Sequence, residues 1–245
     1  MIRPAALVRP VLTLALGLSL GGGALLAMAP PSGAQGGPTA LGEAASRTRA
    51  EILLEALRQR NGEAVFASLA PDVRRFTSLP AIQARLNQVP PIRSVRILEV
   101  FSGADDSTIR AELLAGDQRR PLTLVIDAEG QLVAWRFDST QLPIEQLARS
   151  FVAELAEGQV VTARSRLSIR LQEELTPAVI QARWRGLERR VGPFQQIKGT
   201  VVAHAGGDQQ LVLVTTRFAK LTDNLFVIFD GQNRIVGIDF PIDTP

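Results

Sequence analysis

The stretch that decides the fold is Thr176–Gln195, TPAVIQARWRGLERRVGPFQ, because part of it occurs twice in the chain. Its Ile180-Gln181-Ala182-Arg183 repeats Ile82-Gln83-Ala84-Arg85, and each copy follows a Pro-Ala pair of the kind that opens helices. A second repeat joins Val125-Ile126-Asp127 to Ile228-Phe229-Asp230. Both repeats are spaced by about 100 residues, which is too long for a solenoid and indicates a duplicated small domain.

The first half has helical periodicity first and strand alternation afterwards. We expect a helix opened by the capping box Thr48-x-x-Glu51, a short helix through Val65 to Leu69, and a helix over 80–89 that stops at Pro90-Pro91. The strands that follow are expected near 95–100 and at 108–115, 122–126 and 132–137.

The second half repeats this order. An apolar stripe over 144–155 predicts one helix, and Thr176-Pro177 opens another that ends near Gly192-Pro193. Strands are expected at 194–205, 209–219, 224–229 and 235–240. The predicted fold class is therefore α+β, with two tandem domains at 46–140 and 141–245, each with helices packed on one face of a four-stranded antiparallel sheet.

The N-terminus has the order of a secretory signal. Residues 1–10 carry only the positive charges of Arg3 and Arg9, residues 11–26 are an apolar run, and small-residue cleavage patterns follow at 27–29 and 32–34. We expect cleavage after Ala34, a flexible lead-in over 35–45, and a periplasmic or extracellular protein that meets the membrane only through its signal segment. The alternative is an uncleaved anchor, although the run is short for a membrane span.

Composition excludes several classes of protein. The chain has 245 residues, no Cys and a single His, so disulfide scaffolds, thiol nucleophiles and thiolate metal sites are excluded. Its 27 basic and 24 acidic side chains come close to balance once the signal segment is removed. The arginines at 183, 185, 189 and 190 are interrupted by Glu188 and have only Trp184 as an aromatic neighbour, so nucleic-acid binding is not expected.

The second half resembles a secreted bacterial family catalogued as domain of unknown function 3887. The resemblance rests on Leu175-Thr176-Pro177, on Trp184 and on Gly192-Pro193-Phe194-Gln195, and it extends over residues 142–243. The first half matches weakly, because Leu86 stands near the place of the Trp and Pro90-Pro91 replaces Gly-Pro-Phe. The resemblance implies a cystatin-like, nuclear-transport-factor-like fold and a non-catalytic or ligand-binding module, with no catalytic residues to carry over.

Four residues of the second half are candidate ligand-binding residues. If Leu211 and Leu213 face the helices, then Thr215 and Arg217 lie on the same face, with Arg217 at the rim of a cavity near Trp184. Asp239 on the last strand could then pair with Arg217, and a strand-end salt bridge is the simpler explanation of that pair. We read the single histidine, His204, as a turn residue, because it has no partner for metal binding or general base catalysis.

Three functions are compatible with these features. The favoured one is an exported, non-catalytic binding or accessory module of the cell envelope, which acts by binding either an envelope partner or a small ligand in the cavity of the second domain. The alternative is a small-molecule isomerase or hydrolase that uses carboxylates in that cavity. The third is a module that forms a homodimer through its sheet. No metal, cofactor or catalytic residue is expected, and the S-x-x-K, P-loop and H-E-x-x-H motifs are absent from the sequence.

Overall fold

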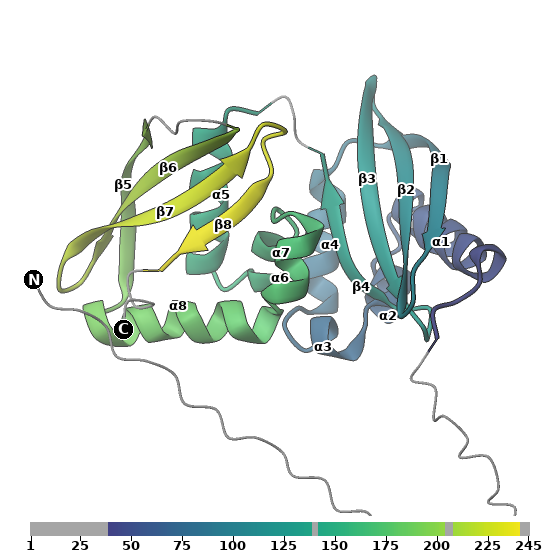
Figure 1. Ribbon diagram of the computed structural model, residues 1–245, viewed down its shortest axis with the longest axis horizontal. Coiled ribbons are helices and arrows are strands. Elements are labelled where there is room, and N and C mark those ends of the chain that lie inside the picture. The colour runs from purple at the N-terminus through teal and green to yellow at the C-terminus, as the bar shows by residue number, and fades with distance from the viewer. Residues whose placement is uncertain (1–38, 139–141, 204–207, 241–245) are drawn as a thin grey trace, which may run out of the picture. The chain divides into compact units, whose positions relative to one another are not determined.

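The computed structural model describes residues 39–138, 142–203 and 208–240. The expected signal segment 1–34, His204 and the Gly206-Gly207 turn lie outside these residues. Two copies of one α+β arrangement follow each other along the chain, and both belong to one compact unit, Gly36–Pro245 (Figure 1).

The first copy consists of four helices and then four strands. Its helices are α1 (Glu43–Arg58), α2 (Gly62–Ser68), α3 (Pro71–Arg74) and α4 (Leu79–Gln88). Its strands are β1 (Ile92–Ser102), β2 (Asp106–Ala115), β3 (Gln118–Asp127) and β4 (Leu132–Phe137).

The second copy has the same order. Its helices are α5 (Ile144–Ala156), α6 (Val160–Arg164), α7 (Ile169–Glu174) and α8 (Pro177–Val191). Its strands are β5 (Phe194–Ala203), β6 (Gln209–Phe218), β7 (Thr222–Asp230) and β8 (Ile235–Asp239).

Each copy forms an antiparallel meander in which every strand pairs with the next one in sequence. Helix α1 packs on β1 and β2, and α5 packs on β5 and β6 (Figure 1). The predicted α+β fold with two tandem domains is therefore confirmed.

Several local predictions differ from the structure. The first helix begins at Glu43 rather than near Ser46, so Thr48 is not a cap: its hydroxyl donates to the Ala44 carbonyl one turn earlier within the helix. The earlier start is fixed by burial, because Ser46 is 0% exposed and its hydroxyl bonds that of Ser107 on β2. Helices α3, α6 and α7 were not expected, since helices of four to six residues are too short to show a full amphipathic period.

The two copies match in details that support their duplication. Isolated parallel bridges join Leu69 to Leu132 and Leu167 to Ile235, at corresponding positions of the two copies. The N-caps of α4 and α8 also correspond, because the hydroxyls of Ser78 and Thr176 each accept a backbone N–H three residues later.

The turns after β3 and β7 are built on equivalent aspartates with opposite pKa shifts. Burial raises the pKa of Asp127, and the backbone N–H groups of Gln131, Glu129 and Gly130 offset this only in part. Burial also acts on Asp230, but the backbone and side chain of Arg234 outweigh it and the net pKa is lowered. Two differences between the turns bear on the sign: Arg234 stands where the first copy has Gln131, and the first copy has Glu129, whose charge raises the pKa of Asp127 further, where the second has Gln232.

We expect Asp230 to titrate below Asp127 when both carboxyl carbons are followed by NMR. Gln131→Arg should lower the pKa of Asp127, and the reciprocal Arg234→Gln should raise that of Asp230. By linkage, the lowered pKa of Asp230 stabilises the folded state above the unfolded pKa of this group, and that stability is lost as pH falls through the folded pKa. The raised pKa of Asp127 has the opposite effect, so the ionisation of Asp127 lowers the stability of the folded state as pH rises. An unchanged order of the two titrations in both variants would contradict this assignment.

The inner face of the second sheet is the opposite of the one expected. Along β6, Val212, Val214, Thr216 and Phe218 are 0–2% exposed and face the helices, while Leu211 and Leu213 lie on the outer face. Both sets are largely apolar, so alternation alone does not distinguish them. The structure distinguishes them through Phe218, which packs against Trp184 of α8.

Side chains of the second copy cover the free edge of β4. The Arg164 guanidinium donates to the Val133 carbonyl at 2.9 Å, and the Gln172 amide donates to the Trp135 carbonyl at 2.9 Å. Val161 of α6 belongs to the core cluster of the first copy. These contacts protect an edge strand and attach the two copies to each other.

Candidate functional site

The four candidate residues of the second copy do not form one site. Trp184 is 5% exposed and belongs to the core, whereas Thr215 lies on the outer face, where its hydroxyl donates to the Asn224 side chain at 2.7 Å. Arg217 and Asp239 are both exposed.

Arg217 and Asp239 are also too far apart to pair. Arg217 lies opposite Thr222, while Asp239 lies opposite Phe226, which in turn lies opposite Leu213. Arg217 and Asp239 are therefore separated by two strand spacings and by about 13 Å along the strands. The register places them at different levels of the sheet.

Aromatic side chains fill the space between α8 and the second sheet. The Trp184 ring lies 6.0 Å from Phe194 and 6.1 Å from Phe218, measured between centroids, and Phe194 and Phe218 are 6.1 Å apart. Phe194 and Phe218 are also the first residue pair of the β5–β6 ladder. This trio occupies the place where the sequence predicted a ligand cavity.

The first copy has smaller side chains at the three equivalent positions. Leu86 follows the cap Ser78 by the same number of residues as Trp184 follows Thr176. Ile92 and Ala115 are the first pair of the β1–β2 ladder, as Phe194 and Phe218 are in the second copy. Three aromatic rings are thus replaced by Leu, Ile and Ala, which leaves the first copy underfilled at this end.

A cleft of about 1060 Å³ lies at that place, and Leu86, Ile92 and Ala115 all line it. Its volume is slightly above the ~300–1,000 Å³ found for small-molecule sites. The cleft extends from the inner face of the first sheet and α4 to side chains of α5, α6 and α8.

The floor of the cleft is apolar. It is formed by Leu113, Leu122 and Leu124 of the sheet, which are 1–2% exposed. Towards the mouth the side chains are more exposed, and Phe137 reaches 37%. An apolar molecule that enters between α4 and the sheet would be enclosed mostly by aliphatic and aromatic side chains.

Cationic side chains dominate the polar part of the lining. Among the described lining residues there is one carboxylate, that of the exposed Glu157. The arginines of the lining are Arg60, Arg75, Arg85, Arg120, Arg136, Arg166 and Arg185.

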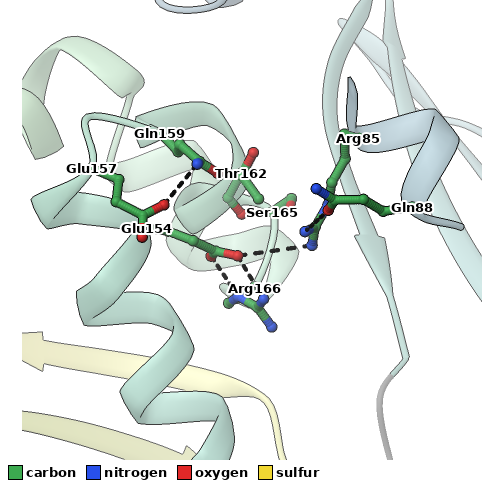
Figure 2. Close-up of polar contacts among 8 residues, drawn as sticks. All are labelled: Arg85, Gln88, Glu154, Glu157, Gln159, Thr162, Ser165 and Arg166. Carbon is green, nitrogen blue, oxygen red and sulfur yellow. Dashed lines mark hydrogen bonds and ion pairs between the residues drawn. The ribbon is translucent and has the colours of Figure 1, made fainter. Parts of the chain in front are cut away.

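Some of these arginines are neutralised by carboxylates outside the lining. Figure 2 shows Glu154 between Arg166, which it binds through two hydrogen bonds of 2.6 Å, and Arg85, whose nearest nitrogen is 3.8 Å away. Because Glu154 is 7% exposed, this cluster is a partly buried ion-pair network that joins α4 to α5 and to the segment between α6 and α7. Arg75 pairs with Asp72 at an exposed position, and the buried Arg136 pairs with Asp138.

The described lining of the cleft is poor in acidic groups. Its single carboxylate is exposed, and no buried acid, histidine or nucleophile lies in its lining within the described part of the chain. No group of His, Asp or Glu suited to a metal ion is found in residues 39–138, 142–203 and 208–240. Over the same residues, no helix combines the length and the apolar composition needed to cross a membrane.

Comparison with known proteins gives one family. Residues 148–238 match the model of a family described as Protein of unknown function (DUF3887), and the resemblance expected for the second half is confirmed. The match extends from α5 to β8, so the cleft of the first copy lies largely outside it. A search of the curated proteins finds no match.

Proposed function

We propose that this protein is an exported, non-catalytic binding module of the cell envelope that holds an apolar ligand in the cleft of its first copy. The observation that carries the proposal is the replacement of Trp184, Phe194 and Phe218 by Leu86, Ile92 and Ala115 in an otherwise matching domain. One copy is closed by its own aromatic side chains, and the other offers the same space to a ligand. The signal-like order of residues 1–34 supports export.

The proposal moves the ligand from the second copy to the first. A filled core has no room for a ligand, because protein interiors are packed as densely as organic crystals. The lining of the cleft favours binding over the alternative of carboxylate catalysis, which needs an ionisable acid deep in an apolar pocket. We assign the second copy the role of a support that holds β4 and one wall of the cleft in place.

A neutral fluorescent dye tests the proposal. N-phenyl-1-naphthylamine brightens in apolar sites, and we expect saturable binding to the protein recovered from the exported fraction of expressing cells. Ala115→Phe introduces the aromatic ring of the second copy and should weaken dye binding by about tenfold or more, because the ring occupies the end of the cleft. Leu86→Trp should act in the same direction.

The matched control is Ala104→Phe, which makes the same change at an exposed turn between β1 and β2. It should leave dye binding unchanged. Thermal melts confirm that the variants fold, and the two filling variants keep the test decisive if one of them does not. Saturable binding that survives both folded filling variants, or no saturable binding by the unaltered protein, would overturn the proposal.

A further inference from the structure

The inner face of the first sheet is mostly apolar, and among its polar side chains are the buried hydroxyl of Ser107 and one cation. Residues at alternate positions of β2 and β3 face the helices and are 0–2% exposed: Ile109, Ala111, Leu113, Ala115, Leu122, Leu124 and Ile126. Arg120 continues this face, because it lies opposite Leu113 and two residues before Leu122. Its side chain is half-buried and lines the cleft.

The charge of Arg120 has no carboxylate partner among the described residues. Its guanidinium donates to the Gln118 side-chain carbonyl at 3.2 Å, which is a neutral acceptor. The neighbouring Arg119 is different, because it lies on the other face and pairs with Glu112 at 3.2 Å. In the second copy the position of Arg120 is taken by Asp223, so this cation belongs to the open copy alone.

A second cation that has no carboxylate partner within the described part of the chain, Arg60, lies at the same end of the cleft. It follows α1, and its guanidinium donates to the Val89 carbonyl at 2.5 Å. Val89 is two residues before Pro91, whose carbonyl accepts from Gly116, next to Ala115. Arg60 and Arg120 therefore both line the cleft where β1 begins and β2 ends.

Resting on the proposed function, we infer that the ligand is a single-headed anionic amphiphile, with its carboxylate or phosphate held by Arg60 and Arg120 and its hydrocarbon chain on the Leu113–Leu122–Leu124 floor. A guanidinium that faces an apolar surface is costly to desolvate unless an anion joins it, and its planar fork binds carboxylate and phosphate through paired hydrogen bonds. Four of the other arginines of the lining already pair with carboxylates that lie outside it: Arg75, Arg85, Arg136 and Arg166.

Competition against the neutral dye tests this inference. The competitors share a twelve-carbon chain and differ in the head group: laurate, dodecyl phosphate, dodecanol and dodecyltrimethylammonium, each below its micelle concentration, with inorganic phosphate as the head group alone. We expect an anionic head to bind about tenfold more tightly than dodecanol, as charge-assisted hydrogen bonds to guanidinium imply. The cationic amphiphile should bind more weakly than dodecanol. Whichever of laurate and dodecyl phosphate binds more tightly identifies the preferred head group as carboxylate or phosphate.

Charge removal on the protein gives the second arm. Arg120→Gln should weaken laurate or dodecyl phosphate by about tenfold and leave dodecanol within twofold, and Arg60→Gln should act in the same direction. Arg119→Gln is the matched control and should change neither affinity. Arg120→Lys keeps the charge and should retain part of the preference, which separates loss of charge from a misfolded variant.

The outcomes separate the two proposals. If neither the dye nor dodecanol binds, the proposed function fails. If both bind and the anionic heads show no advantage, or if Arg120→Gln weakens dodecanol as much as laurate, the binding module stands and the anionic ligand class is overturned. Displacement of the dye by inorganic phosphate alone, at the concentration at which laurate displaces it, would also overturn the inference that the ligand is an amphiphile.

Discussion

Replacing Arg164 by methionine is expected to lower the free energy of unfolding by about 3 kcal/mol or more. The Arg164 side chain is 7% exposed and donates to the carbonyl oxygens of Leu175, Val133 and Gln172 at 3.0, 2.9 and 2.5 Å. A methionine leaves these buried acceptors without this donor, and each unsatisfied group costs about 1–3 kcal/mol.

Removing the charge of Arg164 also removes the desolvation cost of its guanidinium, but this gain is smaller than the loss from the three hydrogen bonds. Burial lowers the pKa of Arg164 to about 10, which reflects the desolvation of its guanidinium. Arg164 remains charged at any pH from 5 to about 8, so the desolvation cost of its guanidinium is already included in the free energy of unfolding of the unaltered protein. The lost hydrogen bonds outweigh this gain, because through one side chain they join α6 to β4 and to the C-terminal end of α7.

Denaturant unfolding measures this prediction, with Arg170→Met as its control. Arg170 is a solvent-exposed arginine of α7 that pairs with Glu174 at 3.4 Å, and its loss should cost less than about 0.5 kcal/mol. The Arg164 variant should also show separate transitions for the two copies, since it detaches the β4 edge. A loss below about 1 kcal/mol with a single transition would show that Arg164 does not join the copies.

Trp184→Leu is expected to cost about 3 kcal/mol and to open a second dye site. The substitution gives α8 the residue that α4 has at Leu86 and leaves Phe194 and Phe218 without their central partner. Large-to-small changes in a core remove transfer free energy and leave a cavity, and because truncation of Trp or Phe to alanine costs about 3–5 kcal/mol, the larger leucine places the cost at the lower end of that range. The dye stoichiometry should rise from one to two per chain.

Trp135→Leu provides the contrast, because Trp135 is a half-buried wall residue of the cleft. We expect it to cost less than about 1.5 kcal/mol and to weaken dye binding at the first site. If the Trp184 variant lost little stability and gained no dye site, the aromatic trio would not be what closes the second copy.

Much of the fold follows from local signals. The recurrence of Ile82–Arg85 at Ile180–Arg183 predicted equivalent helices, and α4 and α8 begin on equivalent caps. The repeated aspartates 127 and 230 predicted equivalent turns, and both organise their turns through backbone hydrogen bonds. Caps and turns depend on residues close in sequence, which is why patterns identify them.

The location of the site did not follow from the sequence. The position of the cleft depends on which face of β6 points inward and on the pairing of Ala115 with Ile92. Both depend on strand register, which is set by contacts between residues far apart in sequence. Leu86 was recognised as standing near the place of Trp184, and that was the available signal that the first copy is less filled. The substitution of Phe218 by Ala115 becomes visible only when the strands are aligned by their pairing.

The most direct test of the account uses the two tryptophans of the chain, Trp135 in the wall of the cleft and Trp184 in the closed core. Their indole N–H signals are followed in a ¹⁵N NMR spectrum while the neutral dye is added to the exported protein. We predict that the Trp135 signal shifts saturably, with the affinity measured by fluorescence, and that the Trp184 signal stays in place. A saturable shift of Trp184 with Trp135 unmoved would place the ligand in the second copy and contradict the account.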